Sequence, residues 1–217
     1  MSRPPRLLLL LGGGGHAAVV ADAARTAHLE VIGFLDDDPD AARRAERAGL
    51  KRLGALDDLA EIIRTGDPGL MVHAAIGDPA LRRRWIDAAR AAAPSAAFEP
   101  IIHASSVVSP SATIGDGAFI GPLAVVNARA SIGEGAIVNS AAVIEHDCVV
   151  GPYSHIAPNA TLCGGVRIGA DCLIGSRAVV RPNEVIEDRA TIGAGAVVAM
   201  RIPAGATARG VPARLSE

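Results

Sequence analysis

Aliphatic side chains recur at every sixth position through the second half of the chain. From Ile102 to Val198, every sixth residue is Ile, Val or Leu, which makes seventeen positions without an insertion. A helix repeats every 3.6 residues and a strand every two, so a sustained period of six fits neither alone. The period predicts short strands joined by tight turns and wound into a parallel β-helix of hexapeptide repeats.

Three hexads make one triangular coil, so residues 18 apart should stack about 4.8 Å apart along the axis. The fourth residue after each aliphatic position is Ala, Ser or Cys in fourteen of the seventeen cases, as a narrow interior requires. Gly directly follows the aliphatic residue in seven hexads, and we expect these glycines at corners with positive φ. The three predicted interior walls are Ile102, Ile120, Val138, Ile156, Ile174 and Ile192; Val108, Val126, Ile144, Leu162, Val180 and Val198; and Ile114, Ile132, Val150, Ile168 and Ile186.

The first half of the chain has a different pattern. An apolar run at 6–11 ends in four glycines, a helical segment follows at 17–27, and a second apolar strand covers 30–35. Strand, Gly-rich turn, helix, strand is the opening of a Rossmann-like α/β unit. A third strand is expected at 70–76, and Asp78 with Pro79 should begin a helix that ends near Ala92.

The predicted fold is therefore an α/β N-terminal Rossmann-like domain at 1–98 and a left-handed parallel β-helix with a short C-terminal tail at 99–217. We expect 201–208 to be a loop, and the tail to cover one open end of the β-helix.

Composition narrows the function. Half of the residues are apolar but only five are aromatic, so the core must be aliphatic. A net charge near −2 gives no electrostatic reason to expect a nucleic acid or an anionic membrane as a partner. The three cysteines form no metal-ligand motif, which indicates reduced packing residues and a cytoplasmic protein.

The Gly-rich turn is a candidate ligand site. Gly12-x-Gly14-x-x-Ala17 loosely matches the dinucleotide fingerprint, and Asp36 lies 22 residues after Gly14. Four consecutive glycines make such a match easy, so a phosphate or nucleotide at the helix N-terminus is favoured over NAD. His16 closes the turn and could point at that ligand. The alternative is a tight turn without a ligand.

The sharpest break in the repeat is Glu145-His146-Asp147, where a histidine occupies a turn with a carboxylate beside it. Such a histidine is a usable general base near neutral pH. Gly164 lies 18 residues after His146, hence on the next coil, where it and Gly165 could offer backbone N–H groups to an oxyanion. The alternative is a solvated surface histidine.

His155 lies nine residues from His146, half a coil around the prism, so one chain cannot bring the two together. If three prisms pack around a threefold axis, His155 of one subunit could face His146 of its neighbour. Otherwise His155 is an ordinary outward strand residue.

With these pieces assembled, the sequence resembles the hexapeptide-repeat sugar acyltransferases, and most of all the group of the bacillosamine-pathway UDP-amino-sugar N-acetyltransferase and the sialic acid O-acetyltransferase. The matching motifs are Gly-Gly-His at 14–16, Phe-Leu-Asp-Asp at 34–37, Ala-Ile-Gly at 75–77, Val-Ile-Glu-His-Asp-Cys at 143–148, Ser-His at 154–155 and Gly-Val-Pro-Ala at 210–213. Asp38 and the extra glycine in the Gly-rich loop depart from the family pattern.

The resemblance implies a homotrimer that uses acetyl-CoA. It assigns His146 as the catalytic base with Asp147 as its acidic partner, and it assigns His155, Gly164 and Pro212 to acetyl-CoA. It further assigns Gly14, Gly15, His16, Asp36 and Asp37 to a nucleotide-amino-sugar.

As chemistry, this is direct acetyl transfer to a sugar amine, because no Ser or Cys stands where an acyl-enzyme would form. Sugar O-acetylation, as in the sialic-acid type, stays open. Two further alternatives are a non-catalytic β-helix assembly module and a metalloenzyme of the carbonic anhydrase type. The metalloenzyme needs three His ligands, and the repeat offers only His146 and His155 as good candidates, so no metal is expected.

Overall fold

The computed structural model describes residues 6–38, 40, 47–67 and 69–216. By its internal contacts the chain divides into two compact units, Met1–Ala104 and Ser105–Glu217.

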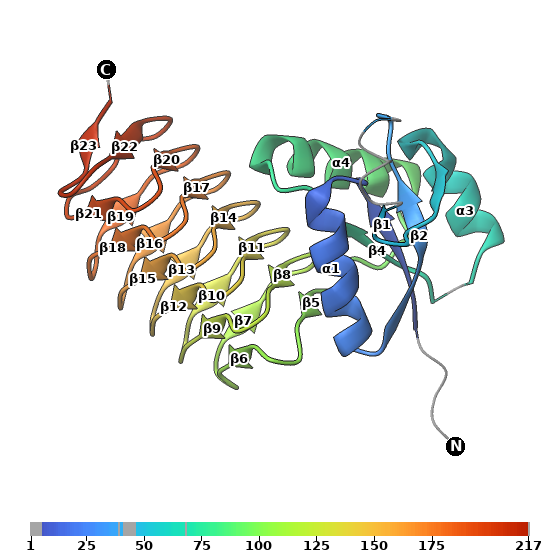
Figure 1. Ribbon diagram of the computed structural model, residues 1–217, viewed down its shortest axis with the longest axis horizontal. Helices are drawn as coiled ribbons and strands as arrows, with labels where there is room; N and C mark the ends of the chain where they lie inside the picture. The colour runs from blue at the N-terminus through green and yellow to red at the C-terminus, as the bar shows by residue number, and fades with distance from the viewer. Residues whose placement is uncertain (1–5, 39, 41–46, 68, 217) are drawn as a thin grey trace. The chain divides into compact units, whose positions relative to one another are not determined.

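The first unit is built on a parallel sheet with the strand order β3-β2-β1-β4 (Figure 1). Leu8 to Leu11 of β1 are completely buried because this strand is central in the sheet. The predicted succession of strand, Gly-rich turn, helix and strand is confirmed. Asp78 Oδ1 accepts a hydrogen bond of 2.7 Å from the Leu81 backbone N–H, and Pro79 is the first helical residue, as predicted. The elements are β1 (Arg6–Leu11), α1 (Gly15–Thr26), β2 (Leu29–Leu35), β3 (Arg52–Gly54), η1 (Leu56–Asp58), α3 (Leu59–Thr65), β4 (Met71–Ala74), α4 (Pro79–Ala92) and β5 (Ile101–Ile102).

The second unit is a left-handed parallel β-helix, whose successive coils are seen edge-on in Figure 1. Its strands form one sheet in the order β7-β10-β13-β16-β19, a second in the order β6-β9-β12-β15-β18-β21, and a third that includes β8, β11, β14, β17 and β20. The strands are β6 (Val107–Val108), β7 (Thr113–Ile114), β8 (Phe119–Ile120), β9 (Val125–Val126), β10 (Ser131–Ile132), β11 (Ile137–Val138), β12 (Val143–Ile144), β13 (Val149–Val150), β14 (His155–Ile156), β15 (Thr161–Leu162), β16 (Arg167–Ile168), β17 (Leu173–Ile174), β18 (Val179–Val180), β19 (Val185–Ile186), β20 (Thr191–Ile192), β21 (Val197–Val198), β22 (Thr207–Arg209) and β23 (Arg214–Leu215).

Neighbouring strands pair residues that are 18 apart, for example Ile132 with Val150, so the predicted stacking is confirmed. From Ile120 to Val198, every sixth residue is at most 2% exposed. From Ile120 onward, the three predicted walls therefore form the core of the β-helix. The first residue of each predicted wall, Ile102, Val108 and Ile114, is only half-buried.

The expectation for the corner glycines is wrong. The glycines that directly follow an aliphatic position do not have φ in the left-handed region. They are needed because the coils approach closely: a Cβ on Gly151 would lie 2.3 Å from the carbonyl oxygen of Gly169. The left-handed corner residue stands two positions later, and there it is often not Gly, as at Arg129 and Asp147, with φ of 59° and 62°.

The C-terminal tail continues the β-helix further than expected. In the segment predicted as a loop, Ile202 bridges to Ile186, and β22 pairs in parallel with β20. β23 then folds back antiparallel to β22, which covers that edge as the sequence predicts for the tail. No helix within the described ranges is long and apolar enough to cross a membrane.

Candidate functional site

The Glu-His-Asp turn lies at a corner of the β-helix, after β12 and before β13, where two of the three sheets meet. Asp147 has positive φ, and its Oδ2 lies 2.7 Å from His146 Nδ1. The His146 side chain remains 59% exposed, and its backbone N–H donates a bond of 3.3 Å to Glu145 Oε2. The corner therefore holds an imidazole that one carboxylate orients and that solvent or a ligand can reach.

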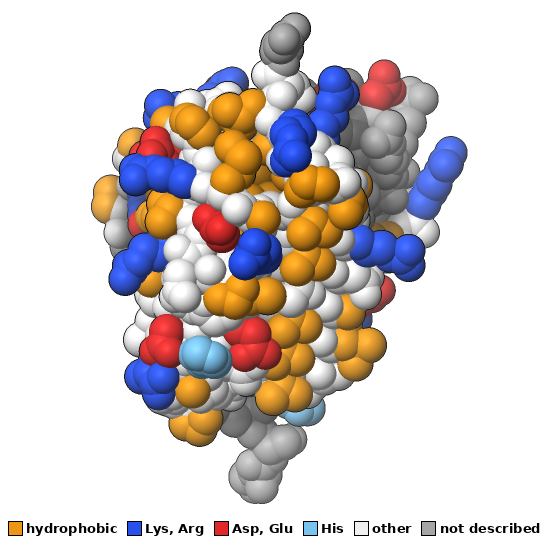
Figure 2. Space-filling model, turned by 90° about the vertical axis from the view of Figure 1, so that its left-hand side faces the viewer, with side chains coloured by type: hydrophobic (Ala, Val, Ile, Leu, Met, Phe, Trp, Pro, Cys, Tyr) orange, Lys and Arg blue, Asp and Glu red, His pale blue; other side chains and the backbone are white. Residues whose placement is uncertain are grey.

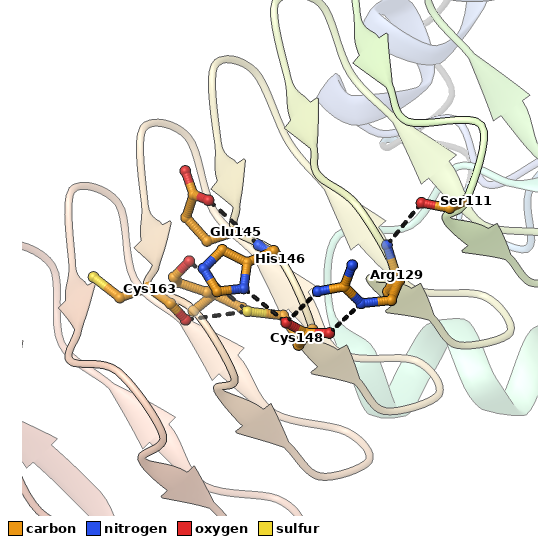
Figure 3. Close-up of polar contacts among 8 residues, drawn as sticks. Ser111, Arg129, Glu145, His146, Cys148 and Cys163 are labelled. Atoms are coloured by element: carbon orange, nitrogen blue, oxygen red, sulfur yellow. Dashed lines mark hydrogen bonds and ion pairs between the residues drawn. The ribbon is translucent and has the colours of Figure 1, made fainter.

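Arg129 lies 18 residues before Asp147, at the same corner of the preceding coil, and forms an ion pair with the Asp147 carboxylate. Its Nε donates to Asp147 Oδ1 at 2.6 Å and its Nη2 donates to Oδ2 at 2.8 Å. Figure 3 shows the Arg129 guanidinium and the His146 imidazole reaching toward this one carboxylate. The Arg129 backbone N–H in turn donates to Ser111 Oγ at 3.1 Å, one coil earlier.

These contacts define the protonation pattern of the corner. Hydrogen bonds from Arg129, and then from His146, hold the pKa of Asp147 well below its usual range. The same carboxylate raises the pKa of Arg129. The ionised Asp147 accepts a hydrogen bond from the N–H at Nδ1 of His146, which leaves the lone pair on Nε2 as the basic site of the ring.

Gly164 on the next coil makes room for the imidazole. A Cβ at this position would lie 2.7 Å from His146 Cε1 and 2.8 Å from Nε2, so the ring rests against the glycine backbone. The Gly165 N–H donates a hydrogen bond to the His146 carbonyl at 2.9 Å, so it is already used and cannot bind an oxyanion. The Gly164 N–H donates no hydrogen bond to any described residue, so of the two predicted oxyanion donors only Gly164 is available.

His155 lies on β14, in the sheet opposite the corner that carries His146, so within one chain the two imidazoles face different ways. Its Nε2 is 3.0 Å from Asn139 Nδ2. The Asn139 side-chain oxygen accepts the Ser140 backbone N–H at 2.8 Å, which orients the amide so that its NH₂ group faces His155. Nε2 of His155 is then the acceptor and Nδ1 carries the proton.

The Gly-rich turn borders a cavity of about 430 Å³ in the first unit. Four of the predicted substrate residues line it: Gly14, Gly15, His16 and Asp36. The fifth, Asp37, is not in the lining, and its Oδ1 accepts the Leu56 backbone N–H at 2.9 Å. The other lining residues are Gly12, Asp38, Ala75, Ile76, Gly77, Leu81 and Trp85.

Asp36 is buried and supports the Gly-rich turn. Its Oδ2 accepts the Gly13 N–H at 2.6 Å and its Oδ1 accepts the Asp38 N–H at 2.8 Å. Gly14, which precedes the first turn of α1, has no atom within 4 Å of where a Cβ would stand, so that space belongs to the cavity. A phosphate could approach the N-terminus of α1 there.

Two buried residues near this cavity have no counterpart among the predicted site residues. His73 on β4 is 1% exposed, and burial, with nearby His16 and Arg82 adding to it, lowers its pKa to about 3. Arg82 is equally buried and its Nη1 donates to the carbonyls of Ile76 and Gly77 at 2.7 and 3.0 Å. The available signal was the fold itself, because loops after adjacent parallel strands meet at one edge of the sheet.

Pro212 lies in the exposed turn between β22 and β23. The hairpin beside it borders a second cavity, of about 480 Å³, lined by Arg209, Arg214, Leu215 and Ser216. Among the residues that the structure describes, no group of three or more His, Cys, Asp or Glu side chains could hold a metal ion.

Two family models match the chain. The PglD N-terminal domain matches residues 7–89, and the bacterial transferase hexapeptide model matches residues 129–164 and 165–199. The predicted resemblance and fold class are confirmed.

Three solved structures resemble the chain over nearly its whole length. PerB from Caulobacter crescentus, in complex with CoA and GDP-perosamine, is 34% identical over 97% of both chains, with a TM-score of 0.89. A variant of the perosamine N-acetyltransferase of the same bacterium, with the same two ligands, is 34% identical over 97% of this chain and 96% of that one, with a TM-score of 0.90. The acetyltransferase domain of PglB from Neisseria gonorrhoeae, in complex with acetyl coenzyme A, is 33% identical over 98% of this chain and 100% of that domain, with a TM-score of 0.85.

Proposed function

The chain belongs to the hexapeptide-repeat acetyltransferases that carry a PglD N-terminal domain, and on that premise we propose that it transfers the acetyl group of acetyl-CoA to the amino group of a nucleotide-linked amino-sugar. The observation that carries the proposal is the His146 imidazole, which bonds through Nδ1 to an ionised Asp147 and has the Gly164 amide beside it. A base and an oxyanion donor within one corner are what acyl transfer from a thioester requires.

The reaction proceeds in one ternary complex. The sugar nitrogen attacks the thioester carbonyl carbon while His146 Nε2 takes a proton from that nitrogen, and Asp147 stabilises the imidazolium that forms. The Gly164 N–H donates to the oxygen of the tetrahedral intermediate. The C–S bond then breaks, the C–N bond remains, and the proton held by His146 neutralises the departing CoA thiolate.

The first unit binds the nucleotide-sugar in this proposal. The cavity beside Gly14, Gly15 and His16 supports it, because the N-terminus of α1 favours a diphosphate and the 430 Å³ space accommodates part of a sugar nucleotide. The sugar nucleotide in PerB is GDP-perosamine, which supports an amine acceptor over the hydroxyl acceptor of the O-acetylation alternative. We include Asp36 and Asp37 in this site, with Asp37 acting through the loop that it holds.

A homotrimer completes the acetyl-CoA site in the proposal. His146 and His155 face different sides of one chain. A second subunit is therefore needed to bring its His155 into the same cleft as His146 of the first. Leu123 and Val107 on the β-helix are 66% and 63% exposed. Figure 2 shows groups of hydrophobic side chains on one face of the molecule. Such side chains favour a protein partner. Sedimentation of active enzyme at the mass of a monomer would contradict the trimer.

We assign His155, Gly164 and Pro212 to acetyl-CoA, which lies along the cleft toward the tail. Since free cysteines and cytosolic co-substrates both fit a reducing compartment, we place the enzyme in the cytoplasm.

The test is the release of free thiol from acetyl-CoA with a panel of nucleoside-diphosphate amino-sugars and their hydroxyl counterparts. We expect turnover with an amine acceptor and a fall in kcat of roughly 10²-fold or more for His146→Asn, in line with loss of a general base. His28→Asn is the matched control, because His28 is exposed and has positive φ, which Asn tolerates well. An unchanged rate for His146→Asn would remove His146 from the mechanism.

A further inference from the structure

Arg129 is the cationic side chain on Asp147, and the proposed mechanism gives it no role. It approaches Asp147 with two parallel N–H groups, one to each carboxylate oxygen, at 2.6 and 2.8 Å. It reaches Asp147 from the preceding coil, because both residues occupy the left-handed position of their hexads, 18 residues apart. In the described part of the chain, the hydrogen bonds of the Glu145 and His146 side chains go to the His146 backbone and to Asp147, not to Arg129.

We propose that Arg129 is a positioning residue, which through Asp147 sets the orientation and the charge environment of the His146 imidazole. The proposal rests on the proposed function, since it gives Arg129 a task only if His146 is the base. Arg129 itself contacts no reacting atom.

The orientation follows from the geometry of the fork. Asp147 is 43% exposed at the side chain, and a carboxylate with one hydrogen bond could turn about its side-chain torsions. Two N–H groups of one rigid guanidinium fix the plane of the carboxylate, as a monodentate partner does not. Asp147 Oδ2 also accepts the hydrogen bond from His146 Nδ1 at 2.7 Å. A fixed carboxylate plane therefore fixes the direction of the imidazole.

The charge environment follows from the net charge of the pair. An unpaired carboxylate beside an imidazole stabilises the imidazolium and so keeps the base protonated to higher pH. Arg129 offsets that field, because the pair Arg129–Asp147 is neutral overall. Glu145 Oε2 accepts the backbone N–H of His146, and Gly164 on the next coil lies against the ring. Among these described contacts of the corner, the Arg129 guanidinium on Asp147 is the only cation.

The test is the pH profile of kcat/KM for Arg129→Gln, Arg129→Lys and Asp147→Asn beside the unaltered enzyme. We expect Arg129→Gln to lower kcat about tenfold and to move the acid limb of the profile to higher pH by about half a unit, from the loss of one charge near the ring in a solvated setting. Asp147→Asn should move the same limb to lower pH, because Arg129 is then uncompensated. Arg129→Lys keeps the positive charge but lacks the two parallel N–H groups of the guanidinium. Compared with Arg129→Gln, it should return the acid limb of the pH profile to its original position and recover only part of kcat.

The control is Arg177→Gln, which removes another exposed arginine from the left-handed position at a different corner. It should match Arg129→Gln in melting temperature and leave the pH profile unchanged. An acid limb that stays in place in Arg129→Gln, with His146→Asn inactive, would overturn the role of Arg129 alone. A fully active His146→Asn would instead overturn the proposed function on which it rests.

Discussion

Substitution of Gly164 by alanine tests the site at the place where the fold and the chemistry meet. The backbone φ of Gly164 lies outside the left-handed region, so alanine fits the main chain without strain. The three atoms nearest to the added methyl would all belong to the imidazole of His146, with Cε1 at 2.7 Å and Nε2 at 2.8 Å. The closest contacts of the new methyl are therefore with the proposed base.

The required displacement can be read from these distances. Ordinary van der Waals contact begins at 3.4 Å, so the ring must retreat by the difference between 3.4 and 2.7 Å, about 0.7 Å. A retreat of this size strains or breaks the 2.7 Å bond between His146 Nδ1 and Asp147, because such bonds weaken beyond about 3.2 Å. We expect kcat to fall roughly 10²-fold, the cost of a misplaced general base.

Stability should respond much less than activity. Replacing Gly by Ala where the backbone permits it stabilises by about 0.4–1 kcal/mol through the unfolded chain, which offsets part of the contact strain. The melting temperature should therefore move by no more than about 2–4 °C for a chain of this size. Thiol-release kinetics and a thermal melt of the same preparation measure both quantities.

Two controls separate the clash from a general loss of fold. Gly195→Ala places a methyl in open space but at a φ of 68°, so it should lower the melting temperature and leave kcat unchanged. In a His146→Asn background, Gly164→Ala should cause no further loss of activity, because the shared interaction is already gone. A Gly164→Ala enzyme with an intact fold and the original kcat would refute the imidazole geometry as the reactive one.

Two further predictions concern the first unit. Because burial lowers the pKa of His73 to about 3, the unfolded chain binds a proton there that the folded chain does not, and stability should fall as pH drops from about 6.5 toward 3, by up to about 1.4 kcal/mol per pH unit. The urea midpoint, followed by fluorescence of the buried Trp85, should thus drop less between pH 7 and 5.5 in His73→Gln than in the unaltered protein; equal drops would contradict the burial of a neutral His73. Gly14→Val should project into the cavity and raise KM for the nucleotide-sugar about tenfold or more at unchanged KM for acetyl-CoA, and an unchanged KM would place the substrate elsewhere.

The β-helix could be predicted almost completely from the sequence, because its register depends on one local property. A one-residue slip would turn every aliphatic side chain out of the prism, so the period of six alone determines which residues stack. Ile132, Val150 and Ile168 align in the structure as that period requires. The corner conformations were harder to predict, because the left-handed position accepts Arg, Asp and Asn as well as Gly, and composition does not mark it.

The first unit was predictable in its order of elements but not in its cavity. Gly14, Gly15 and His16 stand in one turn, so the sequence alone places them together. Leu81 and Trp85 belong to α4 and Ile76 to the loop after β4, and these join the lining only because β4 lies beside β1 in the sheet. Asp37 shows the converse. It is next to the lining residue Asp36 in sequence, but its side chain accepts a hydrogen bond from the Leu56 N–H instead of lining the cavity.

Arg129 shows how the period of 18 can be used in both directions. Adding 18 to His146 leads to Gly164, which the structure places against the imidazole. Subtracting 18 from Asp147 leads to Arg129, which no motif marks and which lies outside the Glu-His-Asp turn. In a stacked coil every corner residue has two axial neighbours, so a polar turn should always be considered together with the residues 18 before and 18 after it. Applied here, that rule joins a cation, a carboxylate, an imidazole and a glycine amide from three successive coils into one site before any side chain is placed.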